Sequence, residues 1–128
     1  MTAEIKGINA SKKTVALRAD MDALPVTERN SLPFASKEKT VFNGQETGVM
    51  HACGHDMHMT VWLGTAQALL EMKDQWKGTL VLIGQPAEEI GAGAKLMLEA
   101  GLFQKFPVPD FGVGLHCSPG IAAGKVGF

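Results

Sequence analysis

A continuous apolar run near the middle of the chain limits its fold more than any other feature. Residues 79–83 read Thr-Leu-Val-Leu-Ile, and Gly78 directly precedes them. A strand buried on both faces has this pattern, whereas a half-exposed strand alternates apolar and polar residues. Strands buried on both faces occur mainly in parallel sheets that helices cover. The run therefore predicts a central strand in a sheet of that kind.

Helical and extended segments alternate around this run. Residues 14–19 and 111–115 also read as strands. Residues 56–73 and 92–100 carry apolar side chains at three- and four-residue steps, and Gly101 is placed to cap the second helix. The order strand, helix, strand, helix, strand predicts an α/β fold, a three-layer sandwich with a mainly parallel sheet flanked by helices.

Two segments stand outside this alternation. Residues 20–50 contain prolines and show no sustained period, which indicates a loop that lines a site or short strands that the pattern does not resolve. Residues 124–128 have the composition of the start of one more strand.

Length and composition limit the class of partner. The chain has 128 residues, of which 45% are hydrophobic and 20% charged, a balance typical of one globular domain with a real core. Its net charge is -1 and it has no run of basic residues, so nucleic acid and membrane surfaces are not expected as partners. The apolar stretches are too short to span a bilayer, and the two cysteines need not pair. We expect a cytoplasmic protein with reduced thiols that binds a small molecule.

Groups that bind metals are concentrated in residues 51–58, which read His-Ala-Cys-Gly-His-Asp-Met-His. Cys53 and His55 flank Gly54, so a turn there would aim both donors at one ion, whereas a regular helix would point them apart. The three histidines also recur at helical spacing, so a polar stripe on a surface helix is the alternative interpretation. The first interpretation predicts a metal site on a loop.

Further polar side chains follow the predicted strands. Asp20 and Asp22 come after the first strand, Glu88 and Glu89 after the second, and His116 ends the third. Because the carboxyl ends of parallel strands meet at one edge of a sheet, we expect these side chains to form one site with the histidine segment.

Each of these clusters also has a simpler interpretation. Glu88 and Glu89 would favour the positive amino-terminal end of the following helix, and Asp20 and Asp22 would cap turns. A thiolate with imidazoles and carboxylates nevertheless suits zinc, cobalt, nickel or manganese better than calcium or magnesium.

Four motifs in this order resemble the amidohydrolase branch of the M20 metallopeptidase family, which includes hippurate hydrolase and N-acyl-amino-acid amidohydrolases. The resemblance runs from about residue 15 to the last residue and rests on residues 18–25, 51–56, 85–89 and 114–116. It implies a catalytic domain of the zinc-exopeptidase type that hydrolyses the amide bond of N-acyl amino acids.

The resemblance also assigns roles to individual residues. Glu88 would be the general acid and base, and Asp22 would orient a ligand without binding metal itself. Two divalent ions are implied, zinc or manganese first and cobalt or nickel as further possibilities, with Cys53 in the place of an aspartate that bridges the ions in related branches. The implied metal ligands are Cys53, His55, Glu89 and His116.

Family members are much longer than this chain. Residues 1–128 are therefore expected to be part of a metallohydrolase catalytic domain, without the lid domain and the carboxy-terminal portion. Those parts supply a histidine for the oxyanion, a final histidine ligand and a homodimer interface, so we expect the chain alone to be weak or inactive. The alternatives are a metal-dependent exopeptidase on the same fold and a non-catalytic metal-binding domain.

Overall fold

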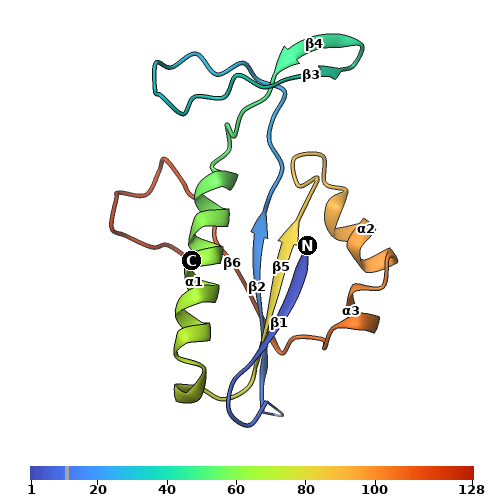
Figure 1. The fold of residues 1–128 in the computed structure, drawn as a ribbon, viewed down its shortest axis with the longest axis vertical. Coiled ribbons are helices and arrows are strands. Elements are labelled where there is room, and N and C mark those ends of the chain that lie inside the picture. Colours follow the sequence, from blue (N-terminus) through green and yellow to red (C-terminus); the bar gives the residue numbers. More distant parts are fainter. Residues whose placement is uncertain (11) are drawn as a thin grey trace.

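The computed structural model describes residues 1–10 and 12–128, which form a sheet with helices on both faces (Figure 1). The sheet has the strand order β1-β5-β2-β6. Its strands are β1 (Thr2–Lys6), β2 (Thr14–Asp20), β5 (Thr79–Gln85) and β6 (Phe111–Gly114). The helices are α1 (His55–Glu71), α2 (Gly93–Glu99) and α3 (Leu102–Lys105), with one 3-10 turn, η1 (Lys73–Gln75).

The three strands expected from the sequence form the parallel part of the sheet. β2 lies in the middle and pairs in parallel with both β5 and β6, so the carboxyl ends of all three meet at one edge. β1 pairs antiparallel with the other side of β5, and the sequence analysis did not foresee it. The predicted α/β fold with a mainly parallel sheet is confirmed, with β1 as an antiparallel edge.

Alternate residues of the strands face the two helical layers. Leu17 and Leu82 point toward α1 and pack with Trp62, whose indole Nε1 donates a hydrogen bond of 2.9 Å to the Leu17 carbonyl. Ala16 and Val81 face the other way, toward α2 and α3. All seven residues of β5 are buried, as the apolar run predicts. The layers are visible in Figure 1, with α1 on one side of the sheet and α2 and α3 on the other.

The long connection 20–50 contains a hairpin, β3 (Lys39–Phe42) and β4 (Gln45–Gly48), that stands beyond the carboxyl ends of β2 and β5 (Figure 1). Asn43 and Gly44, with φ of 51° and 78°, make its turn. Residues 124–128 lie in turn and irregular structure, so the expected further strand is wrong. Within the described residues, no helix is long and apolar enough to cross a membrane.

Candidate metal centre

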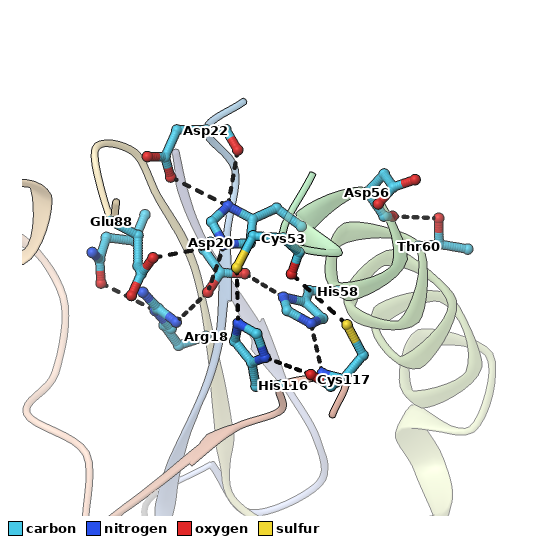
Figure 2. A network of polar contacts seen from close by, with 12 residues as sticks. Arg18, Asp20, Asp22, Cys53, Asp56, His58, Thr60, Glu88, His116 and Cys117 are labelled. Atoms are coloured by element: carbon cyan, nitrogen blue, oxygen red, sulfur yellow. Dashed lines mark hydrogen bonds and ion pairs between the residues drawn. The ribbon is translucent and has the colours of Figure 1, made fainter. Parts of the chain in front are cut away.

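The side chains selected from the sequence gather at the carboxyl edge of the parallel strands. Asp20 is the last residue of β2, and Glu88 and Glu89 follow β5 by three and four residues. His116 lies two residues beyond β6, and His55 is the first residue of α1. Figure 2 shows Asp20, Asp22, Cys53, Glu88 and His116 around one volume, although they come from four separate segments.

A left-handed glycine brings Cys53 and His55 to the same side. Gly54 precedes α1 with φ of 81°, a backbone conformation that other residues adopt only with strain. The turn replaces the regular helix that would separate the two donors. Ligand atoms of Cys53, His55 and Glu89 all lie within 4.8 Å of one another. This is the convergence that the spacing of the sequence predicts.

The hydrogen bonds of His55 determine which of its nitrogens is free. Nδ1 lies 2.8 Å from the carbonyl oxygen of Asp22, and a carbonyl only accepts, so Nδ1 carries the proton. In the neutral ring Nε2 then presents a lone pair, and it is buried without a hydrogen-bond partner among the described residues. Around it lie oxygens of Asp20, Glu88 and Glu89, at 3.7, 3.6 and 3.6 Å. The Nε2 lone pair therefore faces three acceptor oxygens and receives no donor from the described residues, while the Asp20 oxygen also accepts from Arg18.

These separations suit a bound cation. Ligand atoms bind zinc at about 2.0–2.3 Å in a tetrahedral arrangement, so two ligands of one ion lie about 3.3–3.8 Å apart. His55 Nε2 and Glu89 Oε1 are 3.6 Å apart, as are Cys53 Sγ and His116 Nε2. The distances from His55 to the carboxylates are too long for hydrogen bonds from a protonated ring. The donor set therefore fits a divalent ion.

His116 approaches Cys53 from the end of β6. Its Nδ1 lies 2.7 Å from the carbonyl oxygen of Cys117, which fixes the proton on Nδ1 and leaves the Nε2 lone pair toward Cys53. Unlike His55, His116 is exposed. Cys53 thus lies between His116 on one side and the pair His55 and Glu89 on the other.

The carboxylates make the site strongly negative. The Glu89 carboxylate hydrogen-bonds the Cys53 thiol and raises its pKa above the usual value, and burial and the charge of Glu88 act in the same direction. A divalent cation opposes this effect because it stabilises the thiolate, so metal binding would release the thiol proton.

Asp22 is held in its ionised form by backbone groups. Burial acts to raise its pKa, but hydrogen bonds from the backbone N–H groups of Glu89 and Glu88 outweigh burial and hold the pKa below the usual value. The bond from Glu89 N to Asp22 Oδ2 is 3.1 Å. Asp22 thereby connects the loop after β2, which also supplies the carbonyl that orients His55, to the loop after β5.

Glu88 and Glu89 occupy different places although both face His55. Only Glu89 shares the group of mutually close ligand atoms with Cys53 and His55. Glu88 is the more exposed of the two, with 36% of its side-chain surface accessible against 23%. Both carboxylates thus point at the histidine cluster, which an attraction to the start of α2 alone would not explain.

Sequence reasoning included Asp20 and His58 in the expected site without an individual role for either, and the structure places both at the base of the cluster. Asp20 is fully buried and lies 2.6 Å from His58 through Oδ1 and 2.7 Å from Arg18 through Oδ2. Burial acts to raise the pKa of Asp20, but the His58 hydrogen bond and the Arg18 charge hold it below the usual value. The spacing of three residues between His55 and His58 on one helix was the available signal.

Comparison with known proteins agrees with this geometry. The sequence model of the peptidase family M20/M25/M40 matches residues 16–128 of the chain. The chain belongs to this family. Its match to the M20 family includes every residue of the candidate metal centre.

Several M20 relatives resemble the chain over nearly its whole length. An N-acetyldiaminopimelate deacetylase of Lactobacillus acidophilus is 48% identical over 96% of the chain and 29% of its own length. An N-acetyl-L-cysteine deacetylase of Bacillus subtilis is 49% identical over 88% of the chain and 24% of its own length. The thermostable carboxypeptidase 1 of Saccharolobus solfataricus is 49% identical over 96% of the chain and 30% of its own length. The chain thus spans less than a third of the length of these relatives.

A solved M20 structure shows the same fold. A Bacillus subtilis protein described as a dinuclear metal-binding peptidase of the M20 family is 49% identical and superposes with a TM-score of 0.69. The superposition covers 80% of this chain and 26% of the other.

Proposed function

We propose that this chain carries the metal-binding part of an M20 catalytic domain that hydrolyses the amide bond of N-acyl amino acids. Cys53, His55, Glu89 and His116 are the proposed ligands of two divalent ions, zinc or manganese, with cobalt or nickel also compatible with the donors. The relatives named deacetylases and the dinuclear M20 peptidase support this proposal. The residues 1–128 are then one portion of a longer catalytic unit.

One observation carries the proposal. The buried Nε2 of His55 presents a lone pair to oxygens of Glu88 and Glu89, each 3.6 Å away, and no described residue donates a hydrogen bond to it. Buried acceptors without a donor are unfavourable, and a cation among them removes the penalty. A merely structural histidine would have its second nitrogen hydrogen-bonded.

Different residues of this chain have different roles in the proposed reaction. Bound divalent ions supply Lewis acidity, which acidifies water and polarises an amide carbonyl. Glu88 faces the cluster without belonging to the close ligand group, so its carboxylate takes a proton from the attacking water and returns it to the leaving nitrogen. Asp22 holds His55 and the loop of Glu89 in place through its backbone carbonyl and its carboxylate.

A pocket beside the cluster supports a small substrate with an apolar part. Its volume is about 390 Å³, and its lining includes the carboxylates Asp22 and Glu89. Leu24, Phe42 and Ile90 contribute apolar surface around the rest. Pockets of this size with a few polar groups are typical of small-molecule sites.

A metal-dependent carboxypeptidase is the second candidate, because the Saccharolobus relative of that name is as similar as the deacetylases. Both activities would use the same ligands and differ in the substrate pocket. We also propose a cytoplasmic location, which the free thiols of Cys53 and Cys117 support. Homodimerisation of the longer protein through a lid domain rests on the family resemblance alone.

The proposal is tested with metal content and activity. The chain is loaded with zinc or manganese, and bound metal is measured after dialysis, with an expected content of two ions per chain. Activity is measured on a chimera in which residues 16–128 replace the matching segment of the Bacillus subtilis N-acetyl-L-cysteine deacetylase. We expect hydrolysis of N-acetyl amino acids, while cleavage of peptides alone would favour the carboxypeptidase. A chain that binds no metal would refute both.

A further inference from the structure

The buried pair Asp20 and His58 lies beside the proposed metal ligands but has no part in the mechanism above. Both are among the most buried polar residues of the chain, with 0% and 6% of their surface exposed. Atoms of both lie near His55 and His116, so these four residues would by proximity alone pass as a second set of metal ligands. Their hydrogen bonds point to a different role (Figure 2).

Both nitrogens of His58 are already engaged. Nε2 lies 2.9 Å from the backbone nitrogen of Cys117, and a backbone N–H only donates, so Nε2 accepts and carries no proton. The proton of the neutral ring is then on Nδ1, which donates to Asp20 Oδ1 at 2.6 Å. No lone pair of His58 is left for a metal ion.

The carboxylate of Asp20 is engaged as well. Oδ1 accepts from His58, and Oδ2 accepts from Nη1 of Arg18 at 2.7 Å. Arg18 is itself held by Gln85, whose Oε1 accepts from its Nε at 3.0 Å. This series of hydrogen bonds therefore runs from the ends of β2 and β5 through the ring of His58 to the backbone of Cys117.

This series of hydrogen bonds ends at Cys117, next to the proposed metal ligand His116. The peptide nitrogen that His58 holds joins Cys117 to His116, and the Cys117 carbonyl accepts the Nδ1 proton of His116. His116 lies in exposed, irregular chain after β6. The partly buried hydrogen bond to His58 is thus a fixed point for an otherwise exposed ligand.

We propose that Asp20 and His58 are positioning residues, which hold the Cys117 backbone and thereby aim His116 Nε2 at Cys53, and that neither binds metal. This inference rests on the proposed metal site and gives its two buried polar neighbours a function. Groups that orient a ligand in this way commonly change metal affinity by about 10- to 100-fold when removed.

The test compares two substitutions of His58 in the chain, with cobalt(II) alone as the probe. Glutamine carries a donor NH2 and an acceptor carbonyl oxygen in one planar group, so His58→Gln can still donate to Asp20 and accept from Cys117, but it is a poor metal ligand. His58→Ala removes both bonds. We expect His58→Ala to weaken cobalt affinity by about 10-fold or more and His58→Gln to restore most of it. Thr60→Ala, on the exposed side of the same helix, is the control and should leave affinity unchanged.

Two further measurements exclude a general structural effect. In a His116→Ala background, His58→Ala should cause little additional loss, because His58 acts on metal through His116. The thiolate-to-cobalt absorption of Cys53 should persist in His58→Ala, since Cys53 and His55 are unchanged. Equal damage from alanine and glutamine, or an additive double substitution, would overturn the positioning role.

Hydrogen exchange gives a readout that needs no metal. The Cys117 amide should be protected in the unsubstituted chain and in His58→Gln, and should exchange faster in His58→Ala. If the unsubstituted chain binds no cobalt, the proposed metal site fails. If it binds cobalt but Cys117 exchange is insensitive to His58→Ala, only the positioning role fails.

Discussion

Replacing Gly54 by alanine tests whether the turn before α1 creates the metal centre. Gly54 has φ of 81°, and a side chain in this left-handed region costs about 1–2 kcal/mol. A Cβ at Gly54 would also clash with Cys117 Sγ. That sulfur is the exposed end of a short side chain, so moving it costs about 0.5–1.5 kcal/mol. We expect Gly54→Ala to destabilise the chain by about 2–3 kcal/mol.

The two contributions can be separated. In Gly54→Ala/Cys117→Ala the nearest remaining atom is His58 Nε2 at 3.6 Å, an ordinary contact. The double variant should therefore regain the smaller part of the loss, while the cost of the left-handed backbone remains. Gly64→Ala is the matched control, because Gly64 lies inside α1 and a Cβ added there would enter open space. Alanine there should stabilise the helix by about 0.5–1 kcal/mol.

Urea unfolding of the metal-free proteins measures these differences, and cobalt titration of the same samples measures the effect on the site. We expect Gly54→Ala to weaken cobalt binding, because Cys53 and His55 lose their common orientation. The reasoning is refuted if Gly54→Ala is as harmless as Gly64→Ala, or if Cys117→Ala restores full stability. The first result would deny the backbone strain, and the second would assign the whole cost to the sulfur contact.

Four other substitutions test separate parts of the account. In the chimera, Glu88→Gln should retain metal and lower amide hydrolysis by about 100-fold or more, whereas Glu89→Gln should weaken metal affinity in calorimetric titration; the reverse pattern would exchange their roles. Trp62→Phe removes the indole donor to β2 and should lower the unfolding free energy by about 1–3 kcal/mol in urea, and an unchanged value would contradict that bond's importance. The Lys13 ammonium and a backbone N–H lower the pKa of Asp110, so its contribution is complete above its usual pKa and is lost as the pH falls through the lowered value. Asp110→Asn should therefore have a lower unfolding midpoint at pH 7 and no difference at the acid end; a difference independent of pH would argue against the ion pair.

The layers of the fold were predictable because their signals are local and strong. β5 is a continuous apolar run, and α1 carries a long helical period, so neither depends on distant residues for its type. β1 was missed because it is an edge strand with three of its five residues exposed. The hairpin of β3 and β4 had a recognisable Asn43-Gly44 turn, but its strands are only four residues each and largely exposed.

It was predictable from the sequence which side chains would converge in the candidate site, but not which hydrogen bonds they would make. Parallel strands place their carboxyl ends at one edge, so Glu89 and His116 could be expected near Cys53 from topology alone. The engagement of His58 depends on where the chain after β6 crosses α1, a contact between residues 59 positions apart. No local pattern encodes that crossing. The metal ligands themselves stay a prediction.

Anomalous diffraction from crystals of the zinc-loaded chain tests the central claim most directly. Data on both sides of the zinc absorption edge locate the metal without reference to any assumed ligand. The account predicts zinc within about 2.0–2.3 Å of Cys53 Sγ, His55 Nε2 and a Glu89 oxygen, with His116 Nε2 contributing to the same cluster. Zinc bound through His58 or Asp20, or bound away from the carboxyl edge of β2 and β5, would contradict it.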